Sequence, residues 1–344
     1  MNVHFFVTFS KDASNSVFAQ ELKKQNINFR IFSEQVSLRY SHRIWLYLIG
    51  WPRMLLFSVR QAWRSLKTEP KPDWIVVGSH FEVIAVTIIG MLFKKHKSRV
   101  MLLGFIYTAR KSPFLTKLKF LYFSKILAWV DCVVCHSDQE VLQNRHLFKL
   151  KATSFEYIPY GLHLAMPEQG LADYKGEPYA VSAGRSGRDY DLLVKCFTQL
   201  NYPLHIICDS TAVIKDQLLP QNIKILRHCY GHDYINELAN AKMVVIPVAA
   251  DNISAGQMVL IQAMALSKPI IITDTNTTVH YVEKGKTALL VEKGSAEQMI
   301  KAVEELWSNE VLAKDLAKNA IGSFDKNYSM AAYIRGISNL LSKL

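Results

Sequence analysis

The stretch that decides the fold runs from residue 179 to residue 190 and reads YAVSAGRSGRDY. Its apolar beginning, 179–183, predicts a buried strand, and helical spacing starts at Asp189. The loop between strand and helix contains two glycines and two arginines: Gly184, Arg185, Gly187 and Arg188. Glycines let the backbone approach a ligand closely, and a helix start presents N–H groups to anions. Because guanidinium groups match phosphate oxygens, the loop predicts a diphosphate site rather than a plain glycine turn with solvated arginines.

A second turn of this kind follows the apolar run 244–247. It opens a helix expected at 255–266 and contains four candidate binding residues, Ser254, Ala255, Gly256 and Gln257. Ser254 can cap this helix by accepting a hydrogen bond from one of its first N–H groups, which leaves the others for a phosphate. The alternative interpretation is a helix cap without a ligand.

Outward from these turns, short apolar runs alternate with segments of helical spacing. Strands are expected at 3–8, 29–32, 74–77, 100–103, 132–135, 155–158, 179–183, 205–208, 223–226, 244–247, 270–273 and 288–291. Helices are expected at 16–25, 82–93, 113–130, 139–148, 189–200, 234–240, 255–266 and 296–307. This alternation predicts an α/β protein with parallel sheets that carry helices on both faces.

A polar stretch with several prolines and glycines, 164–178, interrupts the alternation. We therefore expect two Rossmann-like, doubly wound domains, 1–165 and 166–327. A helix at 328–344 is expected to pack back on the first domain. Ligands of such sheets bind beyond the carboxyl ends of the strands, so two facing domains would form a cleft there.

The excess of basic over acidic residues is confined to the first half of the chain. The net charge is +12, and the residues up to Ala165 include 23 Lys and Arg against 10 Asp and Glu. The remaining residues include 18 basic and 19 acidic side chains. The asymmetry indicates an anionic partner for the first domain, namely a membrane surface, a phosphorylated lipid or nucleic acid, unless the basic surface is simply solvated.

Two segments of the first half, 40–67 and 113–129, interleave cations with aromatic and leucine side chains. Helices of this composition can lie in the interface of an anionic bilayer. They can also be ordinary surface helices that turn their rings inward. Single-stranded RNA is the third possibility, but we recognise no RNA-binding motif and expect no nucleic-acid partner.

The five cysteines are odd in number and lie mostly in apolar runs, which favours free thiols in a reducing compartment. Cys132 and Cys135 have C-x-x-C spacing, but their surroundings predict a buried strand rather than a metal site. We expect no secretory leader and no membrane-spanning helix, since no apolar run of about 18 residues is visible. A cytoplasmic protein that is peripheral on the inner face of the plasma membrane is therefore expected.

Several motifs resemble the retaining glycosyltransferases of the two-Rossmann-domain superfamily (GT-B fold), in particular the family 4-like group. They are YIPYG at 157–161, the loop 184–190, IPV at 246–248, the turn and helix 254–265, KPII at 268–271 and GKTALLV at 285–291. The resemblance covers nearly the whole second half in the expected order. In the first half it is thinner, mostly strand order and residues 131–140.

The resemblance implies transfer of a hexose from a UDP-sugar or GDP-sugar with retention of configuration. If the basic helices bind a membrane, a lipid-linked or cell-surface glycan acceptor is expected. Arg185 and Arg188 occupy the positions of the family's basic pair, which holds the donor diphosphate. We further expect Arg227 and His228, after a strand, to border the nucleotide base. We expect no essential metal and no cofactor, because cationic side chains would neutralise the leaving diphosphate.

The chain departs from the family pattern at three positions. Two family glutamates, eight residues apart, are replaced by Ser254 and Gln262. The family's N-terminal histidine is replaced by the stretch 103–106, which reads LGFI, and His80 is the nearest substitute. These losses favour a non-catalytic binding subunit as one alternative. A nucleotide-sugar 2-epimerase is another, but it would need carboxylate acid and base groups that we do not find.

Overall fold

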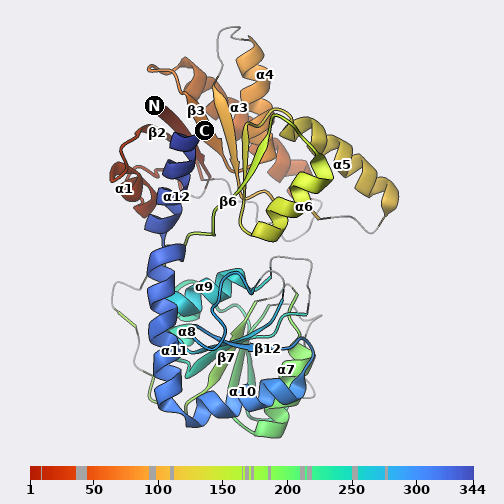
Figure 1. The fold of residues 1–344 in the computed structure, drawn as a ribbon, viewed down its shortest axis with the longest axis vertical. Helices are drawn as coiled ribbons and strands as arrows, with labels where there is room; N and C mark the ends of the chain where they lie inside the picture. The colour runs from red at the N-terminus through yellow and green to blue at the C-terminus, as the bar shows by residue number, and fades with distance from the viewer. Residues whose placement is uncertain are drawn as a thin grey trace. The chain divides into compact units, whose positions relative to one another are not determined.

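The computed structural model describes residues 1–8, 10–35, 45–92, 98–108, 112–164, 166, 170–171, 174–184, 187–209, 214, 219–249, 255–275 and 278–344. The chain divides into two compact units. Unit 1 consists of Met1–Gly161 and Met330–Leu344, and unit 2 is Leu162–Ser329. Figure 1 shows both as sheets covered by helices.

Unit 1 is built on a parallel sheet of order β2-β1-β3-β4-β5-β6. Its strands are β1 (Asn2–Val7), β2 (Asn28–Ser33), β3 (Trp74–Val77), β4 (Arg99–Leu103), β5 (Cys132–Cys135) and β6 (Ser154–Tyr157). Its helices are α1 (Val17–Lys23), η1 (Leu46–Gly50), α3 (Trp51–Lys67), α4 (His80–Leu92), α5 (Pro113–Leu127), α6 (Asp138–Phe148) and α12 (Met330–Lys343).

Both faces of the unit 1 sheet are buried. Along β3, Ile75 and Val77 belong to the core cluster that also holds residues of α3, α4, α5 and α6. Trp74 and Val76 point to the opposite core, where α1 and α12 pack. Period-two alternation places successive side chains on opposite faces, which explains why this strand is apolar throughout. The last helix, α12, thus completes the core of unit 1 and lies beside α1 (Figure 1).

Unit 2 has a second parallel sheet, of order β12-β11-β10-β7-β8-β9. Its strands are β7 (Ala180–Ala183), β8 (Leu204–Ile207), β9 (Ile223–Leu226), β10 (Met243–Ile246), β11 (Ile270–Thr273) and β12 (Leu289–Val291). Its helices are α7 (Tyr190–Leu200), α8 (Gly231–Asn240), α9 (Gln257–Ala265), α10 (Ala296–Ser308), α11 (Glu310–Ser323) and η3 (Phe324–Tyr328).

The strand order of unit 2 reverses between β7 and β10. The chain runs outward from β7 to β9, returns to β10 and then runs outward on the other side. Loops that follow the two central strands therefore diverge, and this divergence opens the crevice in which doubly wound sheets bind ligands. The two glycine turns of the sequence follow these same strands.

The predicted fold class is confirmed, with two parallel six-stranded sheets and helices around them. Most predicted strands match within one residue, and the C-x-x-C pair lies in β5, where both thiols are buried and free. One prediction was wrong, because α9 is capped at Gly256 rather than at Ser254. Helix α11 was not predicted. No helix among the described residues has the length and apolar character needed to cross a bilayer.

Candidate functional site

The loop after β7 is shaped by its glycines. Gly184 has φ +112° and Gly187 has φ +63°, conformations that favour glycine. The Gly184 N–H donates to the carbonyl of Ile207 at 3.1 Å, and its own carbonyl accepts from the Tyr190 hydroxyl. A Cβ at residue 184 would lie 2.6 Å from Nη2 of Arg188. The positive φ of residue 184 therefore favours glycine, and the guanidinium occupies the space that a Cβ would take.

Arg188 is fixed at the centre of this edge of the sheet. Its Nε donates to the Ala183 carbonyl at 3.0 Å. Two backbone hydrogen bonds connect its loop to the segment after β10. The Asp189 N–H donates to the Pro247 carbonyl at 3.0 Å, and the Ala249 N–H donates to the Gly187 carbonyl at 2.9 Å. A Cβ on Gly256 would lie 3.9 Å from Nη1, so the guanidinium stands beside both glycine turns.

Burial lowers the pKa of the Arg188 guanidinium and raises the pKa values of the Tyr190 and Tyr234 hydroxyls beside it. An arginine remains protonated at neutral pH despite such a shift. The result is a fixed positive charge in surroundings with little water, where attraction to an anion is stronger than at an exposed surface.

The start of helix α9 is the second candidate element for binding an anion. Its N-cap, Gly256, has φ +92° and makes no side-chain cap hydrogen bond. The first side chain of the helix, Gln257, is 8% exposed, and its Nε2 finds no hydrogen-bond partner among the described residues. A buried amide donor without a partner is costly, and this one belongs to the first residue of α9, whose first N–H groups also lack partners within the helix.

Gln262 is held by a contact that the sequence did not reveal. The Tyr234 hydroxyl, on α8, donates to its Oε1 at 2.7 Å. With its oxygen engaged in this way, Gln262 offers an N–H donor where a carboxylate would offer only acceptors.

The loops after β8 and β9 form the next part of the edge. Arg227 Nη1 donates to the Cys208 carbonyl at 3.1 Å. Asp209 accepts from the His228 N–H at 2.8 Å and from the Tyr230 hydroxyl. The predicted residues Arg227 and His228 therefore follow the carboxyl end of β9, and Asp209, which no sequence motif indicated, anchors His228.

Two predicted residues, Arg185 and Ser254, lie outside the described residues. Asp189 and Asp191 have the Asp-x-Asp spacing seen in many metal sites. However, Asp189 Oδ1 accepts from the Leu192 N–H as the cap of α7. No group of three metal-ligand side chains occurs within the described ranges.

His80, the candidate of unit 1, is the first residue of α4. Its ring lies among aromatic rings, 4.2 Å from Phe81 and 5.5 Å from Phe123 between centroids. Burial lowers its pKa, so the imidazole is neutral at pH 7. Two residues on, the buried Glu82 accepts from the N–H groups of Gly78 and Ser79, which fixes the turn that carries His80.

A second histidine at the carboxyl edge of the same sheet was not predicted. His136 follows β5, is 9% exposed and has Nδ1 3.0 Å from the Ile158 carbonyl. Because a carbonyl can only accept, Nδ1 carries the proton. Glycine is favoured at residue 104, because its φ is +72° and a Cβ there would lie 3.0 Å from Nε2. The packing of Gly104 on this ring is a tertiary contact that no local sequence motif predicts.

Comparisons with known proteins concern the family of the second unit and the fold. Residues 168–322 match the family described as glycosyl transferases group 1. The fold is that of the GT-B glycosyltransferases. An uncharacterized glycosyltransferase of Methanocaldococcus jannaschii is 24% identical over 161 residues, which is 45% of this chain. The match spans 44% of that curated relative's length.

Solved structures resemble the chain over its whole length. Sucrose-phosphate synthase from Thermosynechococcus elongatus has a TM-score of 0.69 at 15% identity, covering 100% of this chain and 98% of its own. HepE of Anabaena, solved in complex with UDP, has a TM-score of 0.66 at 12% identity, with both chains fully covered. At such identities the likeness shows the fold alone, and the family match concerns residues 168–322.

Proposed function

We propose that the protein transfers a hexose from a UDP-sugar or GDP-sugar to a lipid-linked or cell-surface glycan acceptor, with retention of configuration. The observation that carries the proposal is the position of Arg188. Its half-buried guanidinium stands at the strand-order reversal of unit 2, against Gly184 and beside Gly256. A phosphate-binding cradle at this point is what a nucleotide-sugar donor requires.

In the proposed reaction, cleavage of the sugar–phosphate bond leaves a nucleoside diphosphate whose negative charge grows. Arg188, the N–H groups at the start of α9 and the Gln257 amide would stabilise that charge without a metal ion. The departing phosphate oxygen would take the proton of the acceptor hydroxyl as the new glycosidic bond forms on the same face. His80 and His136, neutral at the carboxyl edge of unit 1, are the candidates to orient the acceptor.

The surface of unit 1 supports the choice of a lipid-linked acceptor. Helix α3 exposes an apolar stripe that recurs every four residues. This tryptophan stripe consists of Trp51, Leu55, Val59 and Trp63. The same helix buries three polar side chains completely: Ser58, Gln61 and Ser65. A helix that exposes tryptophans while burying a glutamine and serines has an outer face suited to an apolar environment.

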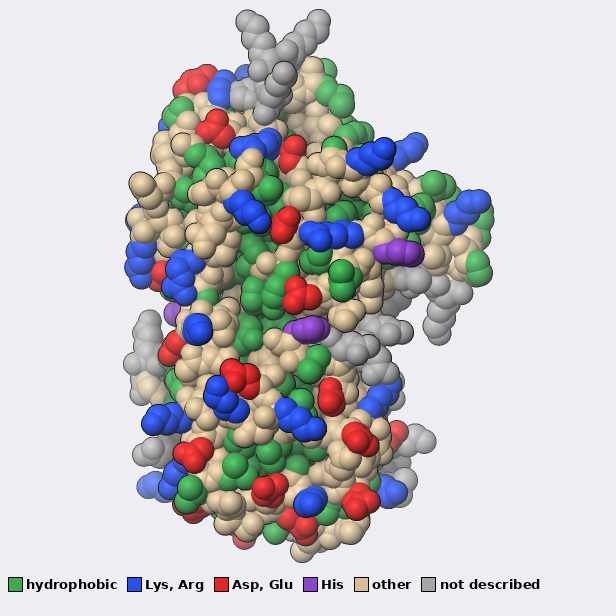
Figure 2. Space-filling view, viewed as in Figure 1, with side chains coloured by type: hydrophobic (Ala, Val, Ile, Leu, Met, Phe, Trp, Pro, Cys, Tyr) green, Lys and Arg blue, Asp and Glu red, His purple; other side chains and the backbone are tan. Residues whose placement is uncertain are grey.

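Neighbouring helices extend the same surface. The end of α4 exposes Ile88, Met91 and Leu92, and α5 exposes Phe114, Leu118 and Tyr122. Exposed cations surround these side chains: Arg53, Arg60, Arg64 and Lys67 on α3, and Lys117 and Lys125 on α5. Lysine and arginine side chains are also spread over the face of unit 1 seen in Figure 2. Apolar side chains among cations suit the headgroup region of an anionic bilayer. We therefore propose a peripheral protein on the cytoplasmic face of the plasma membrane, where a lipid-linked acceptor is available.

The proposal is tested by incubating the purified protein with a panel of UDP- and GDP-sugars and a lipid extract, and measuring release of free nucleotide. One donor should release nucleotide only with the lipid extract present, and EDTA should leave the rate unchanged. Failure of every donor to release nucleotide, with UDP and GDP both bound, would instead support a non-catalytic binding subunit. The engagement of Gln262 Oε1 by Tyr234 is the observation that keeps this second function under consideration.

A further inference from the structure

Unit 2 has a pocket of about 450 Å³ at the opposite edge of its sheet from the glycine turns. Lys242 and Pro269 stand immediately before β10 and β11, and Pro178 stands just before β7. A strand of four residues rises about 13 Å, so the sheet itself separates this pocket from the Arg188 edge. The pocket is therefore independent of the proposed donor site.

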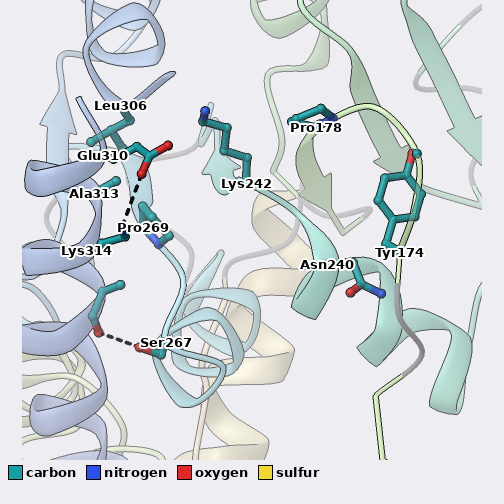
Figure 3. Close-up of a pocket in the computed structure, with 12 residues that line it drawn as sticks. Tyr174, Pro178, Asn240, Lys242, Ser267, Pro269, Leu306, Glu310, Ala313 and Lys314 are labelled. Atoms are coloured by element: carbon teal, nitrogen blue, oxygen red, sulfur yellow. Dashed lines mark hydrogen bonds and ion pairs between the residues drawn. The ribbon is translucent and has the colours of Figure 1, made fainter. Parts of the chain in front are cut away.

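The floor of the pocket is apolar. Pro269, Leu306, Ala313 and Ala317 line it and are buried. The two alanines lie one turn apart on α11, and their small size leaves the space open. Figure 3 shows the α10–α11 residues on one side of the opening and Pro178 and Tyr174 on the other, with Lys242 between them.

The rim of the pocket carries a net positive charge. Glu310 and Lys314 neutralise each other across 3.2 Å. Lys242 has no acidic ion-pair partner among the described residues, and its Nζ lies 5.4 Å from the centre of the Trp307 ring. Because the charged lining residues are these three, one positive charge remains at the mouth of an apolar pocket.

We propose that this pocket binds a small amphipathic monoanion, such as an aryl-alkyl or short acyl carboxylate. Its carboxylate would pair with Lys242, and its apolar body would lie on Pro269, Leu306 and Ala313. The volume falls within the range of small-molecule sites, which are mostly apolar with a few orienting polar groups. A neutral apolar molecule would leave the ammonium group without a partner, so the pocket should discriminate by charge.

The test uses the full-length protein labelled with 5-fluorotryptophan. Trp307 is the sole tryptophan in unit 2, and its ¹⁹F resonance is assigned by Trp307→Phe. The probes are 4-phenylbutyrate and the uncharged 4-phenylbutan-1-ol. We expect a saturable shift of the Trp307 resonance with the acid, at least tenfold weaker binding of the alcohol, and no displacement of the acid by UDP.

Variants decide whether Lys242 reads the charge. Lys242→Met should weaken 4-phenylbutyrate binding at least tenfold. The control is Lys318→Met, which lies on α11 but outside the pocket lining and should leave binding unchanged. Ala317→Leu should fill the pocket and abolish the saturable shift, and if that variant does not fold, Lys242→Met still decides. The proposal is overturned if the acid gives no saturable shift, if alcohol and acid bind equally, if Lys242→Met binds like the wild type, or if UDP displaces the acid.

Discussion

The Arg188 guanidinium lies so close to Gly184 that a Cβ at residue 184 would come within 2.6 Å of Nη2. The left-handed backbone of Gly184 and the placement of the guanidinium are therefore one device. The loop turns sharply so that the guanidinium can fold back over it, where the Ala183 carbonyl holds its Nε. This device presents a fixed cation at the strand-order reversal of unit 2.

Gly184→Ala tests this device directly. The new methyl group should push the flexible guanidinium aside, and the φ of +112° should add strain of about 1–3 kcal/mol. We expect at least a tenfold loss of UDP affinity by calorimetry in a variant that still folds. The matched control is Gly294→Ala, at φ +75° with nothing within 4 Å. It carries backbone strain without touching Arg188 and should bind UDP normally. Equal losses in the two variants would show that strain, and not Arg188, sets the affinity.

Tyr234→Phe tests the orientation of Gln262. Removal of the hydroxyl frees Oε1 from its 2.7 Å hydrogen bond and lets the amide rotate. We expect UDP binding to weaken by about 0.5–1.5 kcal/mol, the usual worth of one hydrogen bond. Tyr202→Phe is the control, because Tyr202 stacks on Trp307 away from this edge. Unchanged affinity in Tyr234→Phe would remove Gln262 from the nucleotide site.

The titration of Glu82 should make the free energy of unfolding depend on pH. Burial raises the pKa of this carboxyl from 4.5 to about 7 in the folded protein. Between these values the folded state binds more protons than the unfolded state, so the wild type loses stability as pH rises. Glu82→Gln cannot ionise, and its stability relative to the wild type should therefore grow from pH 5 to pH 7 and then level off. The total gain should be of the order of 3 kcal/mol. Urea unfolding of both proteins at pH 5, 6, 7 and 8 measures it, and a constant difference would contradict the titration of Glu82.

The tryptophan stripe predicts membrane binding that depends on apolar contact. The double variant Trp51→Ala with Trp63→Ala should co-sediment with anionic vesicles at least tenfold less than the wild type. Binding of the wild type should also fall as salt rises, because screening weakens the attraction of the surrounding cations to the headgroups. Val311→Ala, an exposed apolar residue of unit 2, is the control. Co-sedimentation of the double variant at the wild-type level would separate the stripe from the membrane.

The fold was predictable because buried parallel strands are apolar on both faces. The runs 74–77, 132–135, 223–226 and 270–273 agree with the observed strands residue for residue. Helix α11 could also be predicted from the sequence, because its apolar residues have helical spacing: Leu312, Ala313, Leu316 and Ala317. The cap of α9 was less accessible, because Ser254 is the better capping residue by type whereas Gly256 takes the cap position.

The candidate site could be predicted only where its geometry depends on the local backbone. The local pattern of strand, turn and helix in one short stretch indicates Gly184, Gly187 and Arg188. No such pattern indicates Tyr234, Asp209 or His136, because each acts through a contact with a residue at least 19 positions away. Such contacts are set by the packing of neighbouring loops, and a single sequence carries no local signal for them.

The most direct test of the central claim is the calorimetric affinity of Arg188→Ala for whichever of UDP and GDP the wild type binds more tightly. We predict a loss of about 1.5–3 kcal/mol, the range for a hydrogen bond to a charged group, with Arg188→Lys intermediate. A folded Arg188→Ala protein that binds the nucleotide as tightly as the wild type would contradict the account.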